Sequence, residues 1–469
     1  MTMEAHNTRR RWARRLLAGG FSAALMVTAG HPSYYAAERL AYGRLVRVEG
    51  LAGTNADTAD MCMIPAAVQR AERMAAFTQS RRRAGLALGP ETTVFAGDPG
   101  RKVQDKYPAF AAIGFDHVRS EVVVTDENLF QVLVYDRLVN TPADAEATRP
   151  KRVLAGDNTL IEFESGVYID PNTGDITAPN NDTVDTLVVF AQGSNGDVAP
   201  KRALHTPHGT FGVAVDEKRS EMFLTTQHDS TVVVFRKEAD KDEAPLRLLQ
   251  GTDTGLADPH GIAIDPREEV FFVANYGSRG LRSAKQEIRT GVPGSGKGRE
   301  KANWPLGREY AIPGSGTNAE PSISVHALAA KGNDKPVRVI KGSKTQLNWP
   351  TGIAFDAARR ELFVANDMGP SILVFDAQAE GNVAPKRVLK GALTKLANPT
   401  GVALDLKNGE LWVSNFGGHS ATAYPITAAG NTAPLRTIRS APESAPSLMI
   451  GNPGALTYDS KREEILVPN

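Results

Sequence analysis

Residues 355–391, FDAARRELFVANDMGPSILVFDAQAEGNVAPKRVLKG, contain the unit that decides the fold. Asp356 ends one apolar run, Asn366 ends a second, Phe375 ends a third, and Pro385 opens a fourth. The runs are rich in Val, Ile, Leu and Phe and are separated by Gly, Pro, Asn and Asp. This pattern predicts four short β-strands joined by turns.

The same unit recurs along the chain from seven anchor aspartates, which are 54, 46, 49, 91, 49 and 54 residues apart. The anchors are Asp116, Asp170, Asp216, Asp265, Asp356, Asp405 and Asp459. We place an insertion at 279–320 to account for the long interval. A four-stranded unit repeated at about 50 residues is typical of a β-propeller blade. We therefore predict an all-β fold, a seven-bladed β-propeller of four-stranded antiparallel blades over residues 73–469.

The last predicted blade needs strands from both ends of the chain, because the sequence ends two strands after Asp459. Residues 90–97, PETTVFAG, resemble the fourth strand of the unit, and residues 73–77, RMAAF, stand where a third strand belongs. N- and C-terminal strands would then close the last blade and remove two exposed edges. The residues around 73–77 equally suit a helix, since Ala, Gln, Glu and Arg are frequent there.

Residues 398–438, NPTGVALDLKNGELWVSNFGGHSATAYPITAAGNTAPLRTI, resemble the repeats of NHL and YVTN-type β-propeller proteins. The shared elements are PxG(I/V)AxD, (L/V)(F/W)V(A/S)N, SxxV(F/Y) and GNxAPxRx(L/I). The resemblance extends over about residues 110–469 and implies the propeller fold. Relatives in this superfamily include lactonases, lyases and ligand sensors, so the resemblance does not choose an activity.

The N-terminus predicts export. Residues 1–29 contain five arginines followed by a short apolar stretch, and Val27 and Ala29 suit a small-residue cleavage site. The apolar stretch is shorter than a transmembrane helix requires. Thr8 to Trp12 leave both general secretory and twin-arginine export open. We expect a signal peptide at 1–29, an N-terminal extension at 30–72, and a periplasmic or extracellular protein.

Charge and cysteine content limit the classes of partner. Without residues 1–29 the chain would carry 49 basic and 52 acidic residues, which disfavours nucleic acid as the main partner. The single cysteine, Cys62, excludes an internal disulfide framework. We expect a monomer without a membrane span after removal of the signal, with a small molecule, glycan or protein as its partner.

Two repeated polar positions are interpreted as structural. The residue ten positions after each anchor is an amide or another small polar residue, which suits the end of a strand. An arginine recurs in the fourth strand, where charge on an outer edge discourages pairing with other chains and suits a solvated face. The arginines are Arg152, Arg202, Arg247, Arg338, Arg387 and Arg436.

The insertion at 279–320 is a candidate lid. It contains eight basic and four acidic residues, and it includes Trp304. It interrupts the link between a second and a third strand, on the face where propellers usually bind ligands. A loop of this length is commonly functional or disordered. A functional insertion would be a basic lid that steers an anionic ligand.

The candidate site consists of positions at the predicted channel mouth whose residue type differs from blade to blade. The residue before the opening glycine of each unit varies between blades and includes Phe211, His260, Thr351 and Thr400. In register around His260 lie Glu164, His208 and His228. A carboxylate with imidazoles could bind a divalent metal such as Zn²⁺ or Ca²⁺, or supply a general base.

These residues support two hypotheses of different class. The first is a binding or scaffold protein with Glu164, Phe211, Thr351, Thr400 and Trp304 as ligand contacts. The second is a metal-dependent lactonase- or lyase-type enzyme with His260, His208 or His228 as the catalytic base. The sequence leaves the identity of any metal, and whether the protein is an enzyme, open.

Overall fold

The computed structural model describes residues 105–181, 185–227, 229–279, 317–443, 445, 447, 457–459 and 464–466. Within these residues the chain forms six four-stranded antiparallel sheets, which are the blades of a β-propeller. The predicted unit is therefore confirmed as a blade, but the predicted number of seven blades is wrong. No helix in these residues is long and apolar enough to cross a membrane.

Each blade comes from one continuous stretch of chain. Blade 1 is β1 (Phe110–Asp116), β2 (Glu121–Asp126), β3 (Gln131–Asp136) and β4 (Arg152–Leu154). Blade 2 is β5 (Tyr168–Ile169), β6 (Ile176–Pro179), β7 (Thr186–Phe190) and β8 (Arg202–His205). Blade 3 is β9 (Thr210–Asp216), β10 (Glu221–Thr226), β11 (Thr231–Arg236) and β12 (Arg247–Gln250). Blade 4 is β13 (Pro259–Asp265), β14 (Val270–Asn275), β17 (Ser322–Ala327) and β18 (Arg338–Lys341). Blade 5 is β19 (Pro350–Asp356), β20 (Glu361–Asn366), β21 (Ser371–Asp376) and β22 (Arg387–Leu389). Blade 6 is β23 (Pro399–Asp405), β24 (Glu410–Asn415), β25 (Ser420–Pro425) and β26 (Arg436–Arg439).

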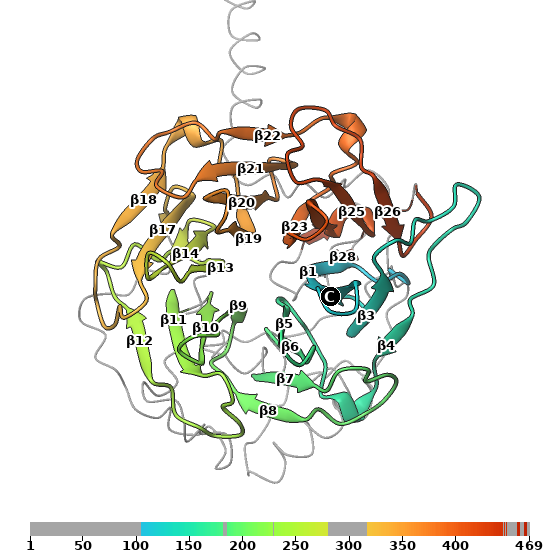
Figure 1. Cartoon of the computed structure of the whole chain (residues 1–469), viewed down its shortest axis with the longest axis horizontal. Coiled ribbons are helices and arrows are strands. Elements are labelled where there is room, and N and C mark those ends of the chain that lie inside the picture. Colours follow the sequence, from blue (N-terminus) through green and yellow to red (C-terminus); the bar gives the residue numbers. More distant parts are fainter. Residues whose placement is uncertain are drawn as a thin grey trace, which may run out of the picture. The chain divides into compact units, whose positions relative to one another are not determined.

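The first strand of each blade lies nearest the centre of the ring, and the fourth lies outermost (Figure 1). Glycine near the start of the first strand is required by close approach of the next blade. A Cβ on Gly352 would lie 2.6 Å from the carbonyl oxygen of Thr400. The glycine of the PxG element is therefore needed because the innermost strands of neighbouring blades lie too close together for a Cβ atom.

Blade 6 packs directly against blade 1, which leaves no place for a seventh blade between them. The hydroxyl of Thr400 donates to the carbonyl of Ala111 at 2.6 Å, and Ser414 donates to the same oxygen at 3.0 Å. Trp412, which is fully buried, shares one hydrophobic cluster with Ile113 and other blade 1 residues. The expectation that terminal strands complete the last blade is therefore corrected, because blade 6 has four strands of its own.

The seventh anchor, Asp459, ends β27 (Thr457–Asp459), which pairs with β28 (Glu464–Leu466). Within the described residues this is a separate two-stranded sheet. It falls in a different compact unit of the chain from the blades. The recurring anchor thus predicted a strand pair correctly here, but that pair is not part of a blade. Residues 1–29, 30–72, 73–77 and 90–97 lie outside the described residues.

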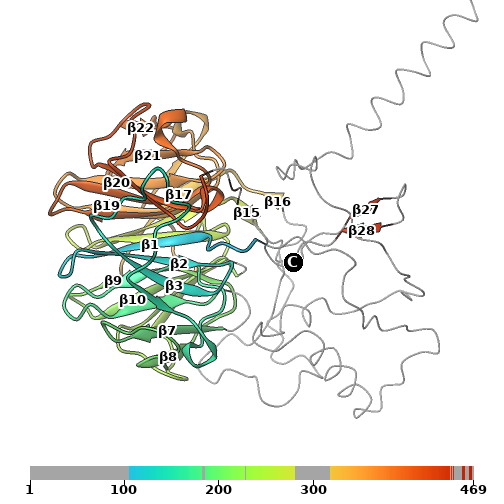
Figure 2. The same cartoon turned by 90° about the vertical axis from the view of Figure 1, so that its right-hand side faces the viewer.

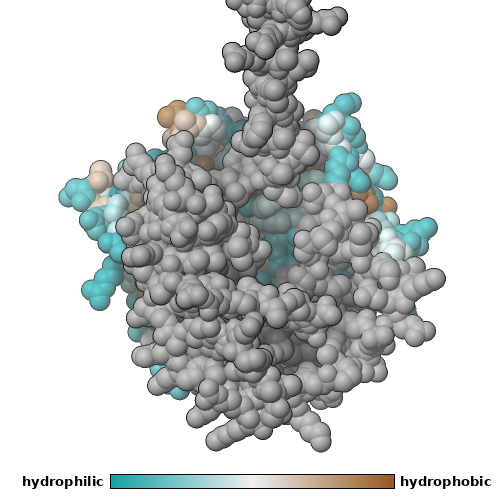
Figure 3. Space-filling model, turned by 180° about the vertical axis from the view of Figure 1, so that it is seen from behind, coloured by the Kyte–Doolittle hydropathy of each residue, from teal (hydrophilic) through white to brown (hydrophobic). Residues whose placement is uncertain are grey.

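The insertion begins and ends in another short pair, β15 (Ser278–Arg279) with β16 (Thr317–Asn318). Figure 2 shows this pair at one face of the ring, which we name the channel-mouth face. Residues 280–316, including Trp304, lie outside the described residues. Figure 3 looks onto this face, and the described residues that are visible at its centre are hydrophilic.

The anchor aspartates and the amides ten positions after them have structural roles, in turns and in loops respectively. The carboxylate of Asp356 accepts the backbone N–H groups of Ala358 and Arg359 at 2.8 and 3.0 Å. The amide oxygen of Asn366 accepts the N–H of Asn348, in the loop that enters the same blade, at 2.6 Å. The second contact joins residues 18 positions apart, so the amide fixes an incoming loop as well as its own strand end.

A backbone clasp joins a blade to the one before it, and in blade 6 the GN motif forms this clasp. Asn431 accepts the N–H of Leu393 at 2.8 Å, and the N–H of Gly430 donates to Val388 of blade 5 at 2.7 Å. Blades 2, 4 and 5 repeat the backbone contact through Gly196, Gly332 and Gly381, and blade 3 makes it through Lys241. Blade 1 closes the ring with a variant of the clasp, since the N–H of Thr141 donates to Thr437 of blade 6 at 2.8 Å.

The fourth-strand arginines form ion pairs, so the interpretation as a solvated edge is wrong for this series. Arg387 binds both carboxylate oxygens of Glu361, at 2.6 and 2.9 Å. The Glu361 side chain is only 7% exposed, and the guanidinium also lies over the ring of Phe363. Equivalent pairs are Arg152–Glu121, Arg247–Glu221 and Arg436–Glu410.

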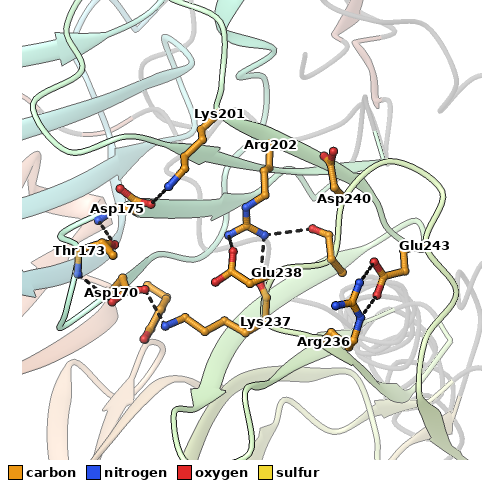
Figure 4. Close-up of polar contacts among 12 residues, drawn as sticks. Asp170, Thr173, Asp175, Lys201, Arg202, Arg236, Lys237, Glu238, Asp240 and Glu243 are labelled. Atoms are coloured by element: carbon orange, nitrogen blue, oxygen red, sulfur yellow. Dashed lines mark hydrogen bonds and ion pairs between the residues drawn. The ribbon is translucent and has the colours of Figure 1, made fainter.

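Blade 2 lacks this glutamate and uses its neighbour instead (Figure 4). Arg202 pairs with Glu238 of blade 3 at 3.1 Å, and Lys237 of blade 3 pairs with Asp170 at 2.6 Å. Lys201 reaches Asp175 within blade 2 at 2.8 Å. Charge compensation at the outer strands thus uses contacts within a blade and, for blade 2, contacts with the next blade as well.

Replacing Glu361 with glutamine is expected to lower the free energy of unfolding by about 1.5–3 kcal/mol at pH 7, because Arg387 loses its charged partner. Hydrogen bonding from Arg387 lowers the pKa of Glu361, although burial opposes it. The pair therefore stabilises the protein above the carboxyl's unfolded pKa, and the contribution is lost as pH falls through the lower, folded pKa. Urea unfolding at pH 7 and pH 3 measures this difference. The exposed pair Lys395–Glu443 supplies the control, since Glu443→Gln should change stability much less. An equal effect of the two substitutions would contradict the prediction.

Candidate functional site at the channel mouth

Two rows of loops meet on the channel-mouth face. One row enters the first strand of each blade, and the other leaves the second strand. Their backbones are joined in every blade: for example, the N–H of Asp367 donates to the carbonyl of Trp349 at 3.1 Å. We name the six residues that donate in this way the inner ring. They are Glu127, Asn181, Gln227, Tyr276, Asp367 and Phe416.

A hydrogen-bonded chain of side chains runs across blades 2, 3 and 4. The amide nitrogen of Asn181 donates to Gln227 Oε1 at 2.7 Å, which directs the Gln227 nitrogen toward His260 Nε2 at 2.7 Å. An amide nitrogen only donates, so His260 Nε2 accepts and Nδ1 carries the proton, donating to the carbonyl of Asp258 at 2.9 Å. Burial lowers the pKa of His260, consistent with this neutral imidazole.

His260 also lies within a row of aromatic rings. It lies 4.3 Å from the ring of Phe211 and stacks on Tyr276 with a centroid distance of 3.5 Å and an interplanar angle of 17°. Tyr276 in turn lies 5.1 Å from Trp349, at 31°. We name these four residues the aromatic row. They come from blade 3, blade 4 and the loop entering blade 5, so the row crosses two blade interfaces.

Asp367 connects the aromatic row to blade 6. Its carboxylate accepts the hydroxyl of Tyr276 at 3.2 Å and the amide of Asn398 at 2.9 Å. Burial raises the pKa of Asp367, and the two hydrogen bonds only partly offset this effect. Burial also raises the pKa of Tyr276, with further increases from nearby carboxylates. The hydroxyl therefore remains a donor at neutral pH.

Glu164 is a fully buried carboxyl group, and neither of its oxygens has a hydrogen-bond partner. It replaces the residue that is Phe110 in blade 1 and Pro259, Pro350 or Pro399 in blades 4 to 6, opposite the end of the second strand. Burial raises its pKa well above the usual value, and the charge of Asp126 raises it further. Burial also raises the pKa of Asp126, to about 7.

The other sequence-predicted residues take different positions. His208 contacts Asp185 at 3.0 Å. The hydroxyls of Thr351 and Thr400 donate to backbone carbonyls of the following blade, at 3.2 Å to Pro399 and 2.6 Å to Ala111. They therefore join blades. His228 and Trp304 lie outside the described residues, so their proposed roles stay predictions.

The described residues contain no group of three or more His, Cys, Asp or Glu side chains arranged to hold a metal ion. The carboxylates, amides and ring faces of the channel mouth can instead orient a ligand by hydrogen bonding and stacking.

The inner ring could have been found from the sequence. Its members stand eleven residues after each anchor aspartate, directly after the repeated amide position. Every blade carries a different residue there, whereas the preceding position is nearly constant. The signal was this change from constancy to variation between adjacent positions, whereas the sequence-based interpretation rested on the constant position alone.

Comparison with known proteins adds little to this geometry. No family model matches the sequence, and no curated protein matches it. Hydrazine synthase from Kuenenia stuttgartiensis is a similar solved structure, with 11% sequence identity and a TM-score of 0.43. The match covers 78% of this chain and 97% of that chain. Such a likeness carries no argument about function, and the propeller assignment rests on the six sheets themselves.

Proposed function

We propose that this protein is a binding propeller, which holds a ligand on its channel-mouth face by means of the inner ring and the aromatic row. One observation carries the proposal. The inner ring has a different side chain in every blade, and contacts across blades join two pairs of them, Asn181 with Gln227 and Tyr276 with Asp367. Structural positions in a propeller repeat, because every blade needs the same turn or clasp. A variable position at the channel mouth suits recognition of an asymmetric ligand.

Two further parts of the proposal rest on the sequence. The residues quoted above suggest a relationship to NHL and YVTN-type propellers, and residues 1–29 suggest export to the periplasm or cell exterior. If the signal peptide is removed on export, the exported chain should begin near residue 30. N-terminal sequencing of the exported protein tests this, and a chain that still begins at residue 1 would contradict it. The metal-dependent enzyme remains an alternative, but no contact in the described residues favours it over binding.

Thermal-shift screening of the full chain tests the binding function. Metabolites, glycans and peptides are screened against the wild type, inner-ring variants Gln227→Ala and Tyr276→Ala, and opposite-face variants Val118→Ala and Lys407→Ala. A ligand at 100 times its Kd should stabilise the folded state by about 2.7 kcal/mol, which raises Tm by several degrees. We expect this shift in the wild type and in the opposite-face variants, and its loss in the inner-ring variants. Ligands whose effect survives both inner-ring substitutions would overturn the proposal.

A further inference from the structure

Trp349 occupies a backbone conformation that disfavours it. Its φ is +55°, in the left-handed region, where a large side chain is uncommon. The equivalent residues in blades 3, 4 and 6 are Gly209, Asp258 and Asn398, which also have positive φ. Glycine, aspartate and asparagine tolerate this region. The turn therefore favours these small residues, and blade 5 is the blade in which a tryptophan replaces them.

Burial does not compensate for this cost, because Trp349 is 45% exposed. One side of the indole is supported by Tyr276, which is itself stacked on His260. The side chain is thus held in place while a substantial part of it stays accessible. A residue that is unfavourable for the backbone and incompletely buried, at the mouth of the channel, suggests a role in binding.

Carboxylates predominate among the charged groups around this position. The charges that act on Tyr276 are the carboxylates of Asp367, Asp258 and Glu127, which belong to blades 5, 4 and 1. Carboxylates outnumber lysines and arginines in the described loops of the channel-mouth face. Such a surface attracts cations and disfavours anions. This part of the face therefore differs from the basic lid that the insertion sequence predicted.

We propose that the channel mouth binds an alkylated ammonium ion, with its charged group against the exposed face of Trp349 and close to Asp367. This inference rests on the proposed binding function and names the class of ligand. Aromatic faces attract cations through the negative potential of the ring, and they favour weakly hydrated quaternary groups. The Asp367 carboxylate is held by Tyr276 and Asn398, so it supplies a fixed counter-charge without having to reorganise.

Isothermal titration calorimetry with three defined probes tests this inference on the full chain. Choline and tetramethylammonium carry the proposed group. The third probe, 3,3-dimethylbutan-1-ol, has the shape of choline without its charge. We expect saturable binding of both cations and at least about tenfold weaker binding of the alcohol.

Matched variants locate the site. Trp349→Asn introduces the residue that blade 6 carries at this position, so it should fold with unchanged or greater stability and lose at least about tenfold in affinity. Trp349→Phe should retain part of the affinity because it keeps a ring face. Asp367→Asn should weaken cation binding without weakening binding of the alcohol. Val118→Ala, which removes an exposed apolar side chain on the opposite face, should change none of these affinities.

Each outcome decides the inference. Equal affinity for choline and the alcohol would overturn it, as would saturable cation binding that survives Trp349→Asn in a folded protein. Absence of binding of either cation at a ligand concentration of about 50 mM would also overturn it, because that concentration exceeds the dissociation constant of even a weak specific site, about 1 mM. A neutral saccharide or an anion found by thermal-shift screening to require the inner ring would leave the binding function intact and show that the ligand class is wrong.

Discussion

Replacing Trp412 with alanine should lower the free energy of unfolding by about 3–5 kcal/mol, the range for removing a fully buried large aromatic residue. The side chain is 0% exposed and lies in the hydrophobic cluster shared by blades 6 and 1. Its loss opens a cavity at the one interface that joins the two ends of the ring. Urea denaturation of the full chain measures the change.

A double-mutant cycle makes the same measurement a test of blade number. Ile113→Ala truncates a blade 1 residue of that cluster. If blade 6 packs against blade 1, the two substitutions should couple by about 0.5–3 kcal/mol. Phe363→Ala, in the equivalent strand of blade 5, is the matched control and should add independently to Ile113→Ala. Additivity of Trp412→Ala with Ile113→Ala would argue for an intervening seventh blade.

Replacing Glu164 with glutamine is expected to stabilise the protein increasingly as pH rises. Burial raises the pKa of Glu164 in the folded protein, so the folded state keeps a proton that the unfolded state has already released. The wild type should then lose about 1.4 kcal/mol of stability per pH unit relative to the variant. This loss begins above the unfolded pKa of about 4.5 and ends at the higher, folded pKa. Over two or three pH units the difference becomes one of the largest single-residue effects expected here.

Unfolding curves for both proteins at pH 4, 5, 6, 7 and 8 give this slope directly. Glu146→Gln, at an exposed carboxyl group, should leave the pH profile unchanged. The opposite result, a glutamine variant less stable than the wild type at pH 7, would mean that Glu164 is ionised and bound to a cation. It would also revive the interpretation of Glu164 as a ligand contact, which the described contacts leave untested.

The blade could be predicted from the sequence because its signals are local. Asp356 opens a turn through its own neighbouring backbone, and Asn366 holds a loop within the same blade. The number of blades depends on which two blades pack together to close the ring. The repeated unit contains no information about that contact. The strand pair at Asp459 matched the unit, yet Trp412 already packs against blade 1.

The candidate site was only partly predictable, for a related reason. His260 and Phe211 were found because they interrupt a repeated position, and both lie in the aromatic row. Tyr276 and Asp367 were missed because their position has no repeated residue to interrupt. The arginine series was misread because its partner, five residues after the anchor, was not compared between units, although Glu361 and Glu410 share that place.

The clasps between blades have a consequence for the order in which the ring can assemble. Each of the first five joins segments that are neighbours along the chain, so it can form as soon as the next blade has left the ribosome. The closing clasp joins Asn140 to Thr437, which are 297 residues apart. Until blade 6 is complete, the apolar residues of blade 1 that pack against it remain exposed to solvent. This interval is the stage of synthesis at which the chain is most exposed to aggregation, and the last blade ends it.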